Sequence, residues 1–165
     1  MGGRASDHAA APRRSHRPHW LARDRHAAAP VPDDALDVQS RRVSGDLMVY
    51  EDGIADIYGR RLSTGRTFPI AVGPPNHRSP DIDGDNVVWV DRGDGRGTHD
   101  QIVVHNLRTG VTRQLTTVPG AKQAPRIFGD RVVWRGNRNA DSAFYGCDLT
   151  SGTGDAYLVV GTTRS

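Results

Sequence analysis

The chain of 165 residues has one cysteine and few aromatic side chains, which make up 6% of the sequence. A single cysteine, Cys147, excludes an intrachain disulfide framework and a cysteine-rich zinc site. No stretch approaches the roughly 18 consecutive apolar residues that a membrane helix needs, so no membrane span is predicted. Turn-forming residues, in contrast, are abundant, with 19 glycines and 10 prolines. This composition is typical of many short elements joined by turns.

Positive charge is concentrated at the start of the chain. The net charge is +3, but residues 1–30 alone contain six arginines and two aspartates, so the rest of the chain sums to −1. A nearly neutral remainder argues against a nucleic-acid-binding face, and no nucleic acid partner is predicted. Residues 1–35 are rich in Ala, Arg, His and Pro without apolar periodicity, which predicts a disordered leader. No apolar core follows its paired arginines, so no signal peptide is recognisable.

The rest of the sequence repeats itself three times. Residues 43–50 (VSGDLMVY), 82–89 (IDGDNVVW) and 127–134 (IFGDRVVW) restate one pattern, and each is followed by a block that ends in Thr-Gly or Ser-Gly. A period of roughly 42 residues built from strand signals indicates propeller blades. We therefore predict an all-β partial or half propeller of three four-stranded antiparallel blades, over about 36–73, 79–118 and 124–160. A β-sandwich with chance similarity is the alternative.

The repeat also predicts the strands within a blade. In the third repeat they are expected at 124–128, 131–135, 143–149 and 155–160, with Gly129 providing the positive φ of the first turn. The run Val-Val-Trp does not alternate apolar with polar residues, so both faces of the second strand are expected to be buried.

The pattern P-x-I-x-G-D-x-V-V-W resembles the TolB-type β-propeller repeat. It is carried by Pro80 and Pro125, by the Gly-Asp pairs at 84–85 and 129–130, and by Trp89 and Trp134. The resemblance covers about residues 36–160. It implies blades of a six-bladed propeller in an extracytoplasmic protein, either periplasmic or secreted, used as a binding or scaffold module and sometimes attached to an enzyme.

No catalytic motif accompanies these repeats: there is no G-x-S-x-G, no H-E-x-x-H and no P-loop. The acidic loop 91–100 lacks the spacing of a calcium-binding loop and holds two arginines, so no metal and no cofactor are predicted. His105 and Cys147 occupy equivalent strand positions and are expected to be structural.

Topology nevertheless points to one end of the blades as a binding face. The loops between strands two and three should emerge beside the connections between blades, expected at 72–79 and 117–124, and loops on a rigid scaffold commonly carry function. The candidate binding face comprises His77, Arg78, Asp91, Arg92, Asp94, Arg96, His99, Asp100, Lys122, Gln123, Asn137, Arg138 and Asp141.

The sequence thus predicts a non-enzymatic module that binds a protein or glycan partner through this face. The alternative is a subunit or fragment of an extracytoplasmic hydrolase or lyase that acts on polysaccharide or peptide at the propeller centre. Because closed propellers have about four to eight blades, three blades predict either a homodimer that closes a ring of six or a truncated half.

Overall fold

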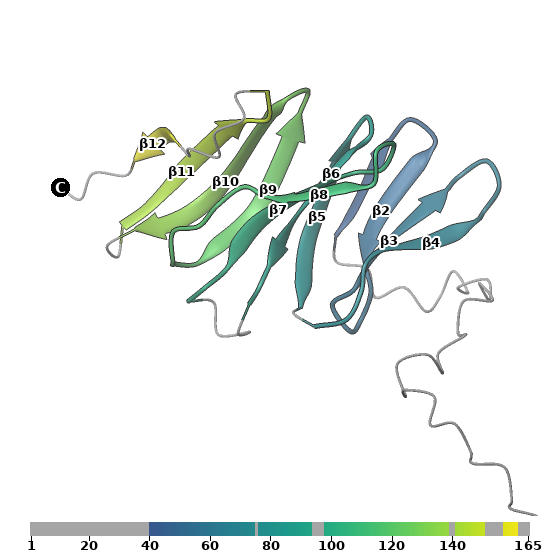
Figure 1. Cartoon of the computed structure of the whole chain (residues 1–165), viewed down its shortest axis with the longest axis horizontal. Helices are drawn as coiled ribbons and strands as arrows, with labels where there is room; N and C mark the ends of the chain where they lie inside the picture. The colour runs from purple at the N-terminus through teal and green to yellow at the C-terminus, as the bar shows by residue number, and fades with distance from the viewer. Residues whose placement is uncertain (1–39, 75, 94–97, 139–140, 151–156, 162–165) are drawn as a thin grey trace, which may run out of the picture.

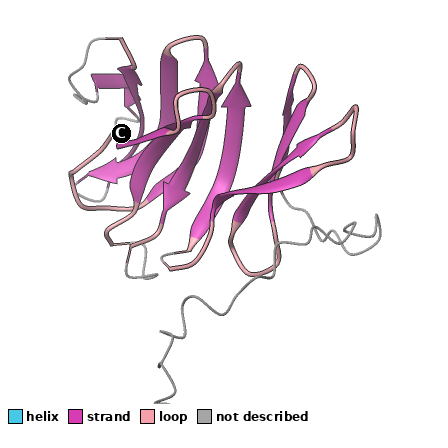
Figure 2. Ribbon diagram, turned by 45° about the vertical axis from the view of Figure 1, so that its right-hand side comes forward, coloured by secondary structure: helices cyan, strands magenta, loops and turns pink. Residues whose placement is uncertain are grey.

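The computed structural model describes residues 40–74, 76–93, 98–138, 141–150 and 157–161. The leader predicted over 1–35 lies outside the described residues. All regular structure in the described part of the chain is β-strand (Figure 2). Within those residues there is no helix with the length and apolarity required to cross a bilayer.

Three four-stranded sheets stand side by side along the chain (Figure 1). Each is an antiparallel meander in which consecutive strands pair, as a propeller blade requires. The first blade contains β1 (Arg41–Ser44), β2 (Leu47–Glu51), β3 (Ile57–Arg61) and β4 (Thr67–Ala71). The second contains β5 (His77–Asp83), β6 (Asn86–Asp91), β7 (Gln101–Asn106) and β8 (Val111–Gln114). The third contains β9 (Lys122–Phe128), β10 (Arg131–Arg138), β11 (Asp141–Asp148) and β12 (Tyr157–Gly161). The prediction of an all-β partial propeller is confirmed.

The first strands of the second and third blades begin two residues earlier than predicted. Ser79 and Ala124, each just before a proline, adopt positive φ angles of 55° and 48°, and the strand register shifts there. At this bulge one extra residue is inserted into the first strand, and the pairing with the second strand continues beyond it in a register shifted by one residue. The strand predicted at 124–128 therefore misses Lys122 and Gln123, which precede the bulge.

The hairpin between β10 and β11 is also longer than predicted. The expected loop from 135 to 142 is mostly strand, and the ladder continues until Arg138 pairs with Asp141. Asn137, Arg138 and Asp141 therefore lie on strands rather than in a loop.

The turns between the first two strands of each blade have the predicted geometry. Gly45, Gly84 and Gly129 adopt φ angles of 56°, 55° and 57°, which glycine reaches without steric cost. The residue after each glycine is an aspartate, and its carbonyl accepts a hydrogen bond from the turn between strands three and four, at 2.7–2.9 Å. Each blade thus has its two hairpin turns tied together at one end, which we call the turn end.

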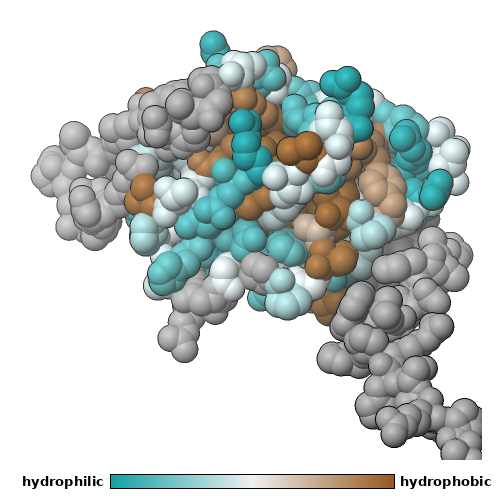
Figure 3. Space-filling view, in the orientation of Figure 1, coloured by the Kyte–Doolittle hydropathy of each residue, from teal (hydrophilic) through white to brown (hydrophobic). Residues whose placement is uncertain are grey.

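The core consists of two apolar layers, one on each face of the second blade. Val87 and Trp89 pack toward the first blade, while Val88 and Val90 pack toward the third. Both faces of β6 are therefore buried, as predicted from Val-Val-Trp. Hydrophilic side chains cover much of the visible surface in Figure 3, and apolar ones show between them in the middle of the view.

Polar contacts join the blades where their first strands converge. Asp81 of β5 accepts a hydrogen bond from the backbone N–H of Ile127 at 3.0 Å and lies 3.3 Å from the Arg42 guanidinium of β1. At the turn end, the Ser44 hydroxyl accepts from the N–H of Gly84, and the Asp83 carboxylate accepts from that of Gly129. Asp81 therefore links all three blades.

Candidate functional site

The loops between strands two and three lie against the connections between blades, at the end of the blades opposite the turn end. The N–H of Arg92 donates to the carbonyl of Asn76 at 2.9 Å, and that of Gly120 to Thr98 at 2.8 Å. The backbone N–H of Asn137 donates to the carbonyl of Ala121 at 3.2 Å. We call this the loop end, and it holds the described members of the predicted candidate face.

Three charged members of that face are used to hold the loop end together. Lys122 is only 7% exposed, and its ammonium donates to the carbonyls of Asp100 and Val118, both at 2.6 Å. The Asp100 carboxylate is buried and lies 3.7 Å from the Arg92 guanidinium. Buried charges that are paired in this way are structural, because little of their surface is left for a ligand.

His77 is also buried rather than exposed. It begins β5, is 7% exposed and packs edge-on against Trp89, with ring centroids 6.1 Å apart. The backbone N–H of His77 donates to the carbonyl of Ala55 in the first blade at 2.8 Å. The prediction that His77 and Lys122 lie in exposed connections is wrong, because the bulged strands begin earlier and carry both residues inward.

The other members of the predicted face have mixed placements. Asp94 and Arg96 lie outside the described residues, and Arg138 and Asp141 are placed only by their strand pairing. Asp91 accepts from the N–H of Gly93 at 3.0 Å. The exposed residues are Arg78, His99, Gln123 and Asn137. Across the described ranges, no three His, Cys, Asp or Glu side chains gather as a metal site requires.

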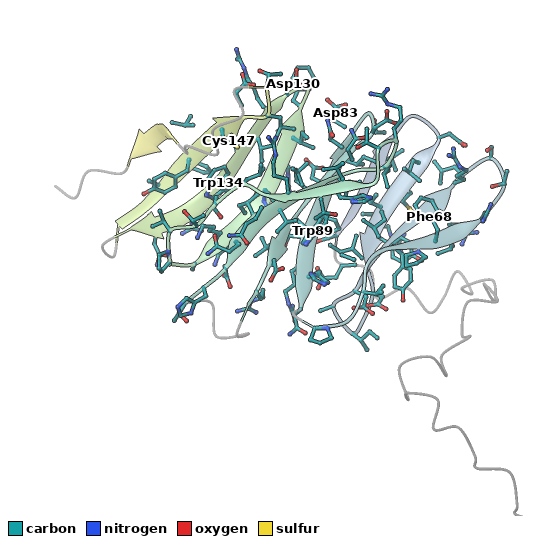
Figure 4. All side chains as sticks on the ribbon, viewed as in Figure 1. Phe68, Asp83, Trp89, Asp130, Trp134 and Cys147 are labelled. Carbon is teal, nitrogen blue, oxygen red and sulfur yellow. The ribbon has the colours of Figure 1, made fainter. Side chains whose placement is uncertain are left out.

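A groove of about 680 Å³ lies at the turn end, between the first and second blades. Its apolar part is formed by Leu47, Phe68 and Leu107. Phe68 of β4 lies across Gly59 of β3, where a Cβ atom would come within 2.5 Å of the ring. The absence of a side chain at Gly59 therefore allows the aromatic ring to form part of the groove (Figure 4). The full lining is Ser44, Gly45, Asp46, Leu47, Arg61, Arg66, Phe68, Gly84, Asp85, Leu107 and Arg108.

The charges in this groove do not cancel. Asp46 accepts hydrogen bonds from the N–H and hydroxyl of Ser63 at 2.8 and 2.7 Å, and these bonds hold the pKa of its carboxyl below the usual range. Asp85 accepts from the Arg108 guanidinium at 3.1 Å. Arg61 and Arg66 form no ion pair with a carboxylate among the described residues, although the positive charge of Arg61 adds to the lowering of the Asp46 pKa.

Guanidinium groups beside an aromatic ring bind carboxylates well. Arginine presents a planar fork of donors that matches a carboxylate, and its weak hydration lowers the cost of partial burial. In the sequence, Arg61 and Arg66 flank the Ser-Thr-Gly turn of the first blade, so two positive charges lie beside one turn. The repeat pattern indicates only a strand connection there.

Two other residues singled out in the sequence lie within strands, as predicted. Cys147 lies in β11 with 1% exposure, and burial raises the pKa of its thiol. His105 lies at the equivalent place on β7 and bonds to the Thr112 hydroxyl at 2.8 Å, while burial lowers the pKa of its imidazole.

No family model and no curated protein matches this sequence. Among solved structures, a TolB protein of Agrobacterium tumefaciens superposes with a TM-score of 0.62 at 17% identity, covering 76% of this chain and 51% of that one. The chain has a TolB-like β-propeller fold. It spans about half the length of that TolB structure.

Propellers of proteases share the same arrangement. The β-propeller domain of the trilobed protease from Pyrococcus furiosus matches with a TM-score of 0.57 at 14% identity, covering 77% of this chain and 42% of that one. The acylaminoacyl peptidase of Pyrococcus horikoshii matches with a TM-score of 0.55 at 13% identity, covering 74% of this chain and 25% of that one. These likenesses establish the propeller fold alone.

Proposed function

We propose that this propeller is a non-enzymatic binding module that holds an acidic segment of a protein partner in the groove between its first two blades. The observation that carries the proposal is that the guanidinium groups of Arg61 and Arg66 line the same groove as Phe68 and form no ion pair among the described residues. A partner chain with Asp or Glu side chains would supply the missing carboxylates, and its apolar groups would cover the ring.

The walls of the groove belong to two blades that are fixed to one another. The Ser44 hydroxyl accepts from the N–H of Gly84 at 3.0 Å, which joins the turns of the first and second blades. The N–H of Leu107 donates to the carbonyl of Asp85 at 2.8 Å within the second blade. A ligand that binds here meets a preorganised surface, so it loses little affinity to ordering of the protein.

A second candidate is a propeller that serves a peptidase. It is favoured by the likeness to the propeller domain of the trilobed protease. In that case the groove would recognise the acidic part of a peptide substrate, and the chemistry would belong to another domain or chain. Release of product from acidic peptides by the purified chain alone would contradict both candidates, because each assigns it binding without catalysis.

The resemblance to TolB-type repeats also carries an expectation about location. An extracytoplasmic module would meet its partner in the periplasm or outside the cell. Fractionation of cells that express the full gene product tests this expectation, and recovery only with cytoplasmic proteins would contradict it.

Calorimetric titration with a hexaglutamate peptide tests the binding function. At about 50 mM salt we expect saturable binding that weakens roughly tenfold when Arg61 and Arg66 are both replaced by Gln, since two charge-assisted contacts are lost. Arg78→Gln is the matched control, because Arg78 lies at the loop end and is similarly exposed. Equal weakening by the control would contradict a site at the groove.

A parallel titration with a hexamer of galacturonate distinguishes the class of partner. Sugar carboxylates carry the same charge, but their rings and spacing differ from those of a peptide. Binding of hexaglutamate that is stronger than binding of the uronate supports an acidic protein partner. The reverse order would identify an acidic glycan instead and contradict the peptide assignment.

A further inference from the structure

Two residues of the first blade shape the groove and differ from their counterparts in the second blade. Phe68 of β4 pairs with Gly59 of β3 and lies across it on the side that faces the second blade. Counted from the Thr-Gly turn, the same places in the second blade are held by Arg113 and Val104, which pair with each other and face the third blade. A glycine and an aromatic ring at the first junction thus correspond to a valine and an arginine at the second.

The second blade uses its arginine to bridge the junction with the third blade. The Arg113 guanidinium donates to the carbonyl of Leu149 at 3.0 Å. Leu149 corresponds to Leu107, since the N–H of each donates to the carbonyl of the turn aspartate in its own blade. At the first junction, Phe68 and Leu107 both line the groove, and a hydrocarbon ring has no donor for a carbonyl. The first junction therefore presents an apolar surface where the second has a polar bridge.

The two arginines of the groove also depart from the pattern of the second blade. Arg61 and Arg66 correspond to Asn106 and Val111, again counted from the Thr-Gly turn. Asn106 is used within its own turn, where its side-chain oxygen accepts from the N–H of Thr109 at 2.9 Å. Arg61 and Arg66 instead line the groove, so the ring and the two positive charges occur together at one junction.

The floor of the groove is the exposed margin of the core between the first two blades. Leu47 and Leu107 are only partly buried, and they pack against the apolar layer that includes Val49 and Ile57. Phe68 is partly buried as well. Apolar surface that stays accessible beside a rigid core favours burial of an apolar side chain of a ligand, and the few charged groups around it fix the orientation.

We infer that the groove recognises a large apolar side chain, Phe or Leu, that lies between acidic residues of the partner. The inference rests on the proposed function and names the residue that anchors the acidic segment. The apolar side chain covers Phe68 on the floor of the groove, while the carboxylates next to it in sequence meet Arg61 and Arg66. An acidic stretch without such a side chain uses the charges alone and leaves the ring in water. Phe68 is therefore a specificity-determining residue.

Two peptides of equal charge test the anchor. Each has two glutamates on either side of a central residue, which is phenylalanine in one peptide and serine in the other, and both termini are blocked. In calorimetric titrations we expect the wild-type chain to bind the phenylalanine peptide roughly tenfold more tightly. This ratio should persist at about 0.5 M salt although both affinities fall, because salt screens the charges and leaves apolar burial in place.

Two phenylalanine variants locate the effect. Phe68→Ala should reduce the ratio of the two affinities to within about twofold. Phe128→Ala is the matched control, because Phe128 is 85% exposed and does not line the groove, so the ratio should stay near tenfold. Circular dichroism and a cooperative thermal transition identify the variants that are folded. In the wild-type chain, intermolecular NOEs from the peptide ring to the methyl groups of Leu47 and Leu107 provide a readout that needs no variant.

The outcomes separate this inference from the proposed function. Equal binding of both peptides by the wild-type chain, with both weakened when Arg61 and Arg66 are replaced by Gln, would overturn the inference and leave the proposed function intact. Absence of saturable binding for both peptides and for hexaglutamate would overturn the proposed function and the inference with it. A tenfold ratio that survives in folded Phe68→Ala, an equal loss in Phe128→Ala, or a bound peptide without NOEs to the floor would overturn the inference alone.

Discussion

Replacement of Asp81 by Ala should destabilise the propeller, because this side chain joins the blades. The Asp81 carboxylate accepts the N–H of Ile127 at 3.0 Å and pairs with Arg42 at 3.3 Å, so one side chain joins three blades. The Asp81 side chain is 10% exposed, whereas that of Arg42 is 37% exposed. Water therefore can replace the partner of Arg42 more readily than the partner of the buried Ile127 N–H.

The magnitude follows from these exposures. Leaving a buried N–H without an acceptor costs about 1–3 kcal/mol. Loss of a half-exposed ion pair adds about 0–1 kcal/mol. We expect Asp81→Ala to lower the free energy of unfolding by about 1–4 kcal/mol, a large share of the roughly 5–15 kcal/mol of a typical domain. Arg42→Gln should cost at most about 1 kcal/mol, because only the exposed partner is lost.

Urea unfolding followed by tryptophan fluorescence measures both changes. Asp81→Asn is the informative control, because an amide oxygen can still accept from Ile127 while the charge is gone. It should recover about half of the loss caused by Asp81→Ala. A loss below about 0.5 kcal/mol for Asp81→Ala would refute the view that the blades depend on this contact.

Three further changes test the loop end, the groove and the turn end. Lys122→Met removes a buried ammonium from carbonyls at 2.6 Å and should cost about 2–4 kcal/mol in urea unfolding, and an unchanged midpoint would contradict its structural role. Gly59→Val should displace the Phe68 ring and weaken hexaglutamate binding, and calorimetry that shows wild-type affinity would contradict the groove geometry. Ser63→Ala should raise the pKa of Asp46 toward its ordinary value, as followed by NMR titration. Since the folded pKa of Asp46 is depressed, its contribution to stability is present above the unfolded pKa of 3.8 and is lost as pH falls through the folded value. In Ser63→Ala, the free energy of unfolding should therefore depend less steeply on pH in the acid range. An Asp46 pKa that does not change in this variant would refute the assignment.

Repetition made most of the fold accessible from sequence. The glycines of the first turns recur at fixed places and are followed by Val-Val-Trp or the related Met-Val-Tyr, so three copies of one local pattern define three blades. The bulges at Ser79 and Ala124 were not predicted, because a positive φ in a non-glycine residue leaves no mark in a single sequence.

The site was harder to predict because it depends on contacts between blades. Burial of His77 and Lys122 comes from partners in a neighbouring blade or a distant loop, which periodicity within a strand does not encode. The groove needs Arg61 and Arg66 from one blade to face Leu107 of the next. Residue types identified the loop end as charged, but only the tertiary contacts showed which charges are already paired.

The central claim, that a partner binds in the groove at the turn end, is tested most directly by NMR titration of the labelled chain with hexaglutamate. We expect the largest shifts at the arginine side chains of Arg61 and Arg66 and at the amides around Phe68 and Gly84. The amides of the loop end, such as those of Arg78 and His99, should move little. The largest shifts at the loop end, with the groove unaffected, would contradict the claim.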